Sequence, residues 1–380
     1  MGKTKNAPVG AFFVLTCCGY LLSVLQLLKP SKINLQKGKT KMAKIAINGF
    51  GRIGRLLFRQ IFGSTGIEIV AVNDLGDLEN LAYLLKYDTA YGKYARKVEI
   101  DGTDLVVDGT RIKVLQMKDP ATLPWKDLNV DVAVEATGFF ESFEKASVHL
   151  TAGAKRVVLT APAKDEDGVS GGKTVLMGIN EGELSTCNIS SNASCTTNSA
   201  SPVIQVLNEK LGISKAILST IHAYTATQNL VDGPTKGKDF RKGRAGAQNI
   251  TPATTGAAIA VGRAVKELAG KFDGISLRVP IVTGSLADIT FVSKRSTTVE
   301  EVNSILEEAS KEPRWQGILS VTHEQLVSSD IVGELSGALV DLSFTKVVDG
   351  DLVKILSWYD NEAGYVSTLI RHIKEAIKFI

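Results

Sequence analysis

The sequence has few of the side chains that disulfide-rich or polyanion-binding proteins need. It contains four cysteines, two of them within the first 42 residues, so it lacks a disulfide framework and is expected in a reducing compartment. Its formal net charge of +4 comes from residues 1–42, which carry seven lysines and no acidic residue. The remaining residues hold 37 basic and 40 acidic side chains, a net charge of −3. We therefore expect no nucleic-acid binding.

One long apolar run occupies residues 9–28, with lysines before and after it. Its length suits a signal anchor, a transmembrane helix or a targeting sequence, although no A-x-A-like cleavage site follows it. The other interpretation is that translation starts at Met42, because the first predicted strand begins two residues later. We expect a soluble, cytoplasmic protein. Organelle targeting or membrane contact through residues 9–28 is the alternative if this extension is retained.

A glycine triplet stands where a predicted strand meets a predicted helix. Residues 44–48 form a short apolar run, Gly49-Phe-Gly51-Arg-Ile-Gly54 follows, and residues 55–62 have helical periodicity. In this context G-x-G-x-x-G indicates a dinucleotide site. The first glycine makes a tight turn, the second lets the backbone approach a pyrophosphate, and the third lets the helix pack closely. We expect the pyrophosphate at the helix N-terminus.

An acidic residue indicates which dinucleotide is bound. A second predicted strand, residues 67–73, is followed by Asp74, twenty residues after Gly54. A carboxylate here accepts a hydrogen bond from the 2′-hydroxyl of NAD and repels the 2′-phosphate of NADP. Leu75-Gly-Asp77 supplies no cation to offset that repulsion. The prediction is NAD; the alternative is that Asp74 merely caps the next helix.

Cys195 stands within the small hydroxyl-rich stretch SNASCTTN, where a strand-like run turns into a helix. Ser194 is a suitable N-cap, and residues 202–211 supply the helical apolar pattern. The helix dipole favours a thiolate, but it lowers a thiol pKa by at most about one and a half units. A second partner is therefore needed, and His222, one of only four histidines, is the candidate. The alternative is a small buried cysteine that only packs.

A dinucleotide site, an activated cysteine and a histidine base together predict a reaction class. The thiolate adds to an aldehyde, the hemithioacetal passes hydride to nicotinamide, and an acceptor releases the acyl group from a thioester. His222 would take the proton and stabilise the oxyanion, with help from the Cys195 backbone N–H.

From about residue 43 onward the chain resembles the glyceraldehyde-3-phosphate dehydrogenase family. The matching stretches occur in the family's order: INGFGRIGR, SNASCTTN, HAYTATQ, VDGPTKG, GRAGAQN, TPATTGAA, LRVP and SWYDNEAGY. The resemblance implies the phosphorylating, NAD-dependent oxidation of glyceraldehyde 3-phosphate in glycolysis and gluconeogenesis. It also implies a homotetramer, in which the polar loop of residues 227–250 reaches the neighbouring subunit's cofactor pocket.

The resemblance also implies roles for particular residues. Cys195 is the nucleophile and His222 the base. Inorganic phosphate is expected at Ser194, Thr196, Thr255 and Gly256, and the substrate's own phosphate at Thr225 and Arg278. No metal site is expected. The expected cofactor contacts are Gly49, Phe50, Gly51, Arg52, Ile53, Gly54, Asp74, Lys118, Thr137, Gly138, Thr160, Asn361 and Tyr365.

Periodicity predicts an α/β fold. Strands and helices alternate over residues 43–194, including a helix over 143–150, and predict a doubly wound parallel sheet of the Rossmann type. Asp108-Gly109 predicts the turn of a hairpin within residues 103–116. Residues 195–360 predict an α+β catalytic domain with a mainly antiparallel sheet and helices on one face. By resemblance, a helix over 361–380 packs back on the first domain, and residues 1–42 are an N-terminal extension.

Two other functions fit parts of the sequence. Erythrose-4-phosphate dehydrogenase is a close relative with the same nucleophile and base. A protein that uses the dinucleotide fold to bind RNA or a partner, with vestigial catalysis, belongs to another class. The intact pair of Cys195 and His222 and the acidic body argue against the binding protein.

Overall fold

The structure is a computed structural model that describes residues 42–235 and 237–380. The predictions for the extension, including the apolar run of residues 9–28, fall on residues 1–41 and so lie outside the described residues. Met42–Ile380 form one compact unit. Within the described part of the chain, no helix is both long and apolar enough to span a bilayer.

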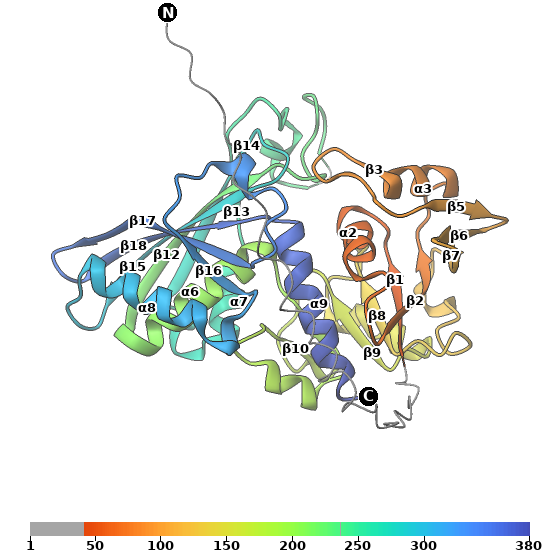
Figure 1. The fold of residues 1–380 in the computed structure, drawn as a ribbon, viewed down its shortest axis with the longest axis horizontal. Helices are drawn as coiled ribbons and strands as arrows, with labels where there is room; N and C mark the ends of the chain where they lie inside the picture. The colour runs from red at the N-terminus through yellow and green to blue at the C-terminus, as the bar shows by residue number, and fades with distance from the viewer. Residues whose placement is uncertain (1–41, 236) are drawn as a thin grey trace, which may run out of the picture. The chain divides into compact units, whose positions relative to one another are not determined.

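The first sheet is formed by the residues before Cys195. Its strands are β1 (Ala43–Asn48), β2 (Ile67–Asn73), β5 (Val98–Asp101), β6 (Asp104–Val107), β7 (Thr110–Leu115), β8 (Val132–Glu135), β9 (Arg156–Leu159), β10 (Gly172–Thr174) and β11 (Ile189–Ser191). They lie in the order β10-β11-β9-β8-β1-β2-β7-β6-β5 (Figure 1). All neighbours from β10 to β7 are parallel, and only the β5–β6–β7 edge is antiparallel. The doubly wound prediction is confirmed.

Helices and a small hairpin connect these strands: α2 (Arg52–Ile61), α3 (Leu78–Lys86), β3 (Tyr87–Asp88), β4 (Gly92–Lys93), α4 (Phe143–Ala146) and α5 (Val148–Thr151). The single helix predicted over residues 143–150 is therefore wrong, because the helix breaks at Ser147. The Ser147 hydroxyl donates to the carbonyl of Glu144 at 2.6 Å, a local bond that competes with the helical pattern. The predicted turn at Asp108-Gly109 is present, and both residues have positive φ.

The second sheet follows Cys195. Its strands are β12 (Ile213–Ala223), β13 (Thr251–Thr254), β14 (Phe272–Val279), β15 (Ser285–Ser293), β16 (Leu319–Thr322), β17 (Ala338–Val348) and β18 (Leu352–Tyr359). Their order is β13-β14-β12-β15-β18-β17-β16, and only the β12–β14 and β16–β17 pairs are parallel. The helices α6 (Cys195–Leu211), α7 (Ala257–Ala264) and α8 (Val299–Lys311) cover one face (Figure 1). The mainly antiparallel sheet was predicted.

The C-terminal helix α9 (Ala363–Ile377) packs on the core of the first sheet, as the resemblance implied (Figure 1). Val366, Leu369 and Ile373 are fully buried in the cluster that includes Ile45 of β1 and Leu57 of α2. Each such side chain contributes about 1.5–3 kcal/mol through burial. Cys195 contacts both this cluster and the main cluster of the second sheet, so the candidate nucleophile lies where the two cores meet.

Candidate active site

The candidate nucleophile is the first residue of α6. The Ser194 side chain accepts a hydrogen bond from the Thr197 N–H at 3.1 Å, which is the N-cap that the sequence predicted. Ala193, just before the cap, is buried and has a φ of 53°, a left-handed value that a residue with a Cβ rarely adopts. The Tyr365 hydroxyl of α9 donates to the Ala193 carbonyl at 3.1 Å. A bond from another part of the chain thus supports the strained turn that presents Cys195.

Cys195 and His222 lie together, as predicted. The Cys195 Sγ is 3.3 Å from the His222 Nε2. His222 belongs to β12, and strand pairing places it opposite Arg278 of β14. One thiol, one imidazole and one guanidinium therefore come from three separate elements to a single place.

Two groups of opposite kind contact the imidazole at Nδ1. The carbonyl oxygen of Ala223, 2.6 Å away, accepts from an Nδ1 that carries the proton, whereas the guanidinium of Arg278 can only donate. In the tautomer protonated on Nδ1, the Nε2 lone pair faces the sulfur and can accept the thiol proton. Arg278 Nη1 donates to the same carbonyl at 3.1 Å and lies 2.7 Å from Nδ1.

The charge state of the pair differs from the sequence-based prediction, which favoured a thiolate. Burial raises the pKa of the Cys195 thiol, and the positive charge of Arg278 and hydrogen bonds from Thr196 offset this only in part. Burial, followed by the nearby charge of Arg278, lowers the pKa of His222 to about 3. The free protein therefore holds a neutral thiol beside a neutral imidazole. Desolvation of the sulfur thus shifts the thiol pKa in the direction opposite to the one that the sequence favoured.

Among the residues predicted to bind inorganic phosphate, Thr196 is buried in the core, whereas Thr255 and Gly256 lie at the start of α7. The Thr196 hydroxyl is buried and lies 2.9 Å from the hydroxyl of Tyr359, so this side chain is used inside the core. Thr255 accepts the Ala257 N–H at 3.2 Å, and Gly256 is exposed at the start of α7. Ala260 of α7 packs against Ala193, which brings this helix to the turn before the nucleophile.

The residues predicted to bind the substrate's phosphate lie on the side of His222. Arg278 is half-buried, and its guanidinium contacts the imidazole, as described above. The Thr225 hydroxyl is 2.9 Å from that of Thr227, two residues beyond the end of β12. A guanidinium and hydroxyl groups readily donate hydrogen bonds to a phosphate.

A separate cavity of about 420 Å³ lies beyond the carboxyl ends of the first sheet's central strands. Five of the predicted cofactor residues line it: Gly49, Gly51, Asp74, Lys118 and Thr137. The sequence analysis missed the other lining residues: Asn48, Asn73, Leu75, Met117, Pro120, Ala136, Phe139 and Phe140. For Asn48 and Asn73 the signal was position, because each ends a predicted parallel strand, where open α/β sheets bind ligands.

The three glycines meet the steric demands of a dinucleotide site. Gly49 has a φ of 97°, and a Cβ there would lie 2.6 Å from the backbone of Ala136. A Cβ on Gly54 would lie 2.0 Å from the Gly49 carbonyl oxygen. A Cβ on Gly51 would meet nothing within 4 Å, so this glycine leaves open space where the pyrophosphate was predicted. The cavity fits the group that the sequence implied.

Asp74 lines the cavity with a fixed carboxylate. It accepts the Phe50 N–H at 2.7 Å and the Gly76 N–H at 2.9 Å, and further lone pairs remain for a ribose hydroxyl. The alternative role as a helix cap is wrong, because Asp77 caps α3 by accepting the Asn80 N–H at 3.0 Å.

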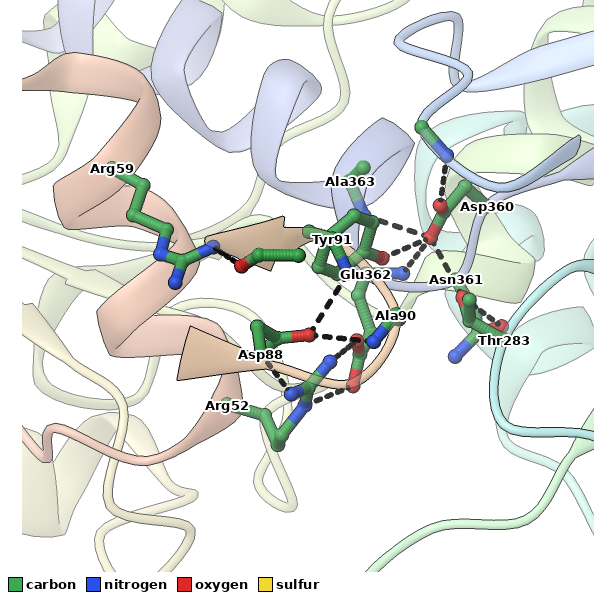
Figure 2. Close-up of polar contacts among 12 residues, drawn as sticks. Arg52, Arg59, Asp88, Ala90, Tyr91, Thr283, Asp360, Asn361, Glu362 and Ala363 are labelled. Atoms are coloured by element: carbon green, nitrogen blue, oxygen red, sulfur yellow. Dashed lines mark hydrogen bonds and ion pairs between the residues drawn. The ribbon is translucent and has the colours of Figure 1, made fainter. Parts of the chain in front are cut away.

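The remaining predicted cofactor residues do not line this cavity. The Phe50 ring is fully buried in the core, and Ile53 packs against the same cluster. Gly138 and Thr160 line a small neighbouring recess. The Arg52 guanidinium forms ion pairs with Asp88 and Glu362 (Figure 2). Asn361 lies in the connection between β18 and α9, and Tyr365 belongs to α9.

Comparison with known proteins identifies the family. Residues 43–143 match the model "Glyceraldehyde 3-phosphate dehydrogenase, NAD binding domain", and residues 194–361 match "Glyceraldehyde 3-phosphate dehydrogenase, C-terminal domain". The chain is 46% identical over 337 residues to the glyceraldehyde-3-phosphate dehydrogenase of Clostridium pasteurianum, covering 88% of this chain and 98% of that protein. It is 49% identical over 340 residues to that of Thermotoga maritima, covering 89% and 100%. The chain belongs to the glyceraldehyde-3-phosphate dehydrogenase family.

Family membership confirms the resemblance and the cofactor prediction. Every residue that lines the large cavity falls within the segment matched by the NAD-binding model, so the cofactor is NAD. An oxidoreductase of this family also accounts for the juxtaposition of a cysteine and a histidine at the start of the second matched segment.

Proposed function

We propose that the protein oxidises glyceraldehyde 3-phosphate to 1,3-bisphosphoglycerate with inorganic phosphate and NAD. The observation that carries the proposal is the 3.3 Å contact between Cys195 Sγ and His222 Nε2, beside the guanidinium of Arg278. A nucleophile, a base and an anion-binding cation are the groups that a phosphorylated aldehyde requires.

The first step joins the aldehyde to Cys195. The sulfur forms a bond with the carbonyl carbon while its proton moves to the His222 Nε2 lone pair. The imidazolium then returns this proton to the new alkoxide oxygen, which gives a neutral hemithioacetal. The Cys195 backbone N–H, in the first turn of α6, would stabilise the oxyanion as it forms.

The second step turns the hemithioacetal into a thioester. Bound NAD supplies the hydride acceptor. His222 removes the hydroxyl proton as hydride leaves the carbon, so the carbonyl of the thioester forms. An oxygen of inorganic phosphate then attacks this carbonyl, the carbon–sulfur bond breaks, and the Cys195 thiolate leaves and is reprotonated.

Substrate binding would make His222 a better base. Burial and the charge of Arg278 lower the pKa of His222 to about 3 in the free protein. A substrate phosphate bound to Arg278 would neutralise much of that charge. The pKa of His222 then rises, because the charge of Arg278 is one of the two causes that lower it. The imidazole therefore accepts a proton more readily when substrate is present.

The proposal is tested by following NADH formation from glyceraldehyde 3-phosphate and NAD, with and without inorganic phosphate. We expect sustained turnover only with phosphate, and none in Cys195→Ser. Sustained turnover without phosphate would contradict the phosphorylating mechanism. Faster turnover of erythrose 4-phosphate would identify the other dehydrogenase, and binding of NAD without any turnover would favour the binding protein.

We also infer that the protein is a homotetramer in the cytoplasm. Strand register places Ile217, Leu352 and Val292 on the face of the second sheet opposite its helices. Ile217 is 57% exposed and Leu352 is 40% exposed. The same register places Lys215, Thr290 and Lys354 on this face. A sheet face that combines exposed apolar side chains with polar ones suits contact with another copy of the chain. The free thiols of Cys187 and Cys195 fit a reducing compartment.

A further inference from the structure

Asp360 is the centre of a hydrogen-bond cluster between the two sheets. This residue follows β18, precedes α9 and is fully buried. Its Oδ1 accepts the hydroxyls of Tyr91 at 2.8 Å and Thr283 at 2.9 Å, and the N–H groups of Glu362 and Ala363, each at 2.9 Å. Its Oδ2 accepts the Gly333 N–H at 2.8 Å. Figure 2 shows these bonds converging on one carboxylate.

The donors come from different parts of the fold. Thr283 and Gly333 belong to connections of the second sheet, and the two N–H groups begin α9. Only Tyr91 comes from the first sheet's part of the chain, in the turn between β3 and β4. Its hydroxyl therefore connects the part that holds the NAD cavity to the carboxylate that precedes Asn361.

The Tyr91 turn is itself held in place. Asp88 accepts the N–H groups of Ala90 at 2.9 Å and Tyr91 at 3.1 Å, and it forms an ion pair with Arg52. Arg52 also pairs with Glu362, so the turn and the start of α9 share one guanidinium (Figure 2). Burial and the neighbouring Asp360 raise the pKa of Tyr91, so its hydroxyl remains a donor.

The same cluster orients the Asn361 amide. Asn361 Oδ1 accepts the Ser285 hydroxyl at 2.9 Å, with the Thr283 hydroxyl 3.3 Å away. Among the described residues, the Asn361 Nδ2 has no hydrogen-bond partner. The carbonyl side of the amide is thus fixed, and its N–H groups are left to donate to a ligand.

We propose that Tyr91 is a positioning residue for the nicotinamide end of NAD, acting through Asp360 on Asn361. The inference rests on the proposed function and on the family resemblance, which implies that Asn361 holds the nicotinamide carboxamide. The Tyr91 hydroxyl anchors Asp360 from the cofactor-binding side, and Asp360 fixes the backbone on both sides of Asn361. The large cavity that Asp74 and Gly51 line, where the adenosine and pyrophosphate are expected, shares no lining residue with this cluster.

The position of the cluster allows a binding test that needs no turnover, and a kinetic measurement complements it. ADP-ribose keeps the adenosine and the pyrophosphate of NAD but lacks nicotinamide. The variant Tyr91→Phe removes only the hydroxyl, and Tyr87→Phe in the same hairpin is the control, because Tyr87 is 45% exposed. The dissociation constants of NAD and ADP-ribose are measured by fluorescence titration of the full chain. The deuterium isotope effect on NADH formation is measured with aldehyde labelled at its carbonyl carbon.

We expect Tyr91→Phe to weaken NAD binding by about tenfold, the order of one hydrogen bond to a charged group, and to leave ADP-ribose binding unchanged. The isotope effect should increase, because a misplaced ring slows hydride transfer, and Tyr87→Phe should match the wild type. Equal weakening of both ligands would show a structural role only and would overturn the proposal, as would no change in either. An inactive wild type with the expected difference between ligands would refute the proposed reaction but not the positioning role.

Discussion

His222 Nε2 points at Cys195 Sγ from 3.3 Å, while its Nδ1 is held against the Ala223 carbonyl and the guanidinium of Arg278. Burial and the charge of Arg278 lower the pKa of His222 and keep the imidazole neutral, with Nε2 directed at the sulfur. In the proposed function, Arg278 would also link a bound phosphate to the proton affinity of the imidazole, because its guanidinium would contact the phosphate as well as the ring.

The first prediction concerns His222→Asn. We expect kcat to fall by about 10²–10⁴-fold, the usual contribution of a general base, while NAD affinity stays unchanged. Alkylation of Cys195 by iodoacetamide, followed against pH, provides the check. In the wild type the rate should still rise above pH 8.5, about the ordinary thiol pKa, because burial raises the pKa of this thiol. An identical profile and rate in the variant would refute the pairing, and Cys195→Ser identifies the alkylated residue.

The second prediction concerns the uncovered face of the second sheet. Ile217→Lys removes an exposed apolar side chain from this face and adds a third positive charge to those of Lys215 and Lys354, so it should split the assembly into smaller species. Light scattering measures the mass, which should be four times the 40.6 kDa of one chain in the wild type. The control is Tyr83→Lys, at a 58% exposed residue of α3, which should leave the mass unchanged. A monomeric wild type would contradict the tetramer.

The third prediction concerns acid stability. Burial lowers the pKa of His222 and of His372 to about 3, whereas an unfolded histidine titrates near 6.5. Below pH 6.5 the unfolded chain therefore binds protons that the folded chain does not, and stability falls as the pH is lowered towards 3. Each residue should cost about 2 kcal/mol between pH 6.5 and 5.

His372→Gln isolates one of the two groups. His372 lies 2.7 Å from the Ser190 hydroxyl and 3.2 Å from Asn192 Oδ1, and glutamine can form hydrogen bonds without titrating. Denaturant unfolding at pH 7 and pH 5 should show a smaller loss of stability in the variant than in the wild type. The same pH dependence in both proteins would exclude His372 as a source of the acid sensitivity.

The parts of the site that the sequence could predict are those that depend on residues close together in the chain. The spacing of Gly49, Gly51 and Gly54 identified the turn after β1, and Asp74 followed its strand at the expected distance. The hydroxyl-rich stretch around Cys195 located the start of α6, because capping depends on residues three positions apart. Element types also followed from periodicity, as the strand β2 over residues 67–73 shows.

Features that depend on distant residues could not be predicted in this way. Arg52 lies in the glycine motif, but its side chain pairs with Glu362, 310 positions later. The Thr196 hydroxyl contacts Tyr359 of β18, and no local signal marks that contact. The raised thiol pKa of Cys195 comes from burial between two cores, which exists only in the folded chain.

The strained turn at Ala193 has a consequence for the order of events during synthesis. The hydroxyl that supports this turn belongs to Tyr365, which a ribosome adds 172 positions after Ala193. His372, which contacts Asn192, is added later still. A nascent chain that already carries Cys195 and His222 therefore still lacks both contacts that α9 makes with this turn. The support of the turn is complete only after α9 has emerged and docked.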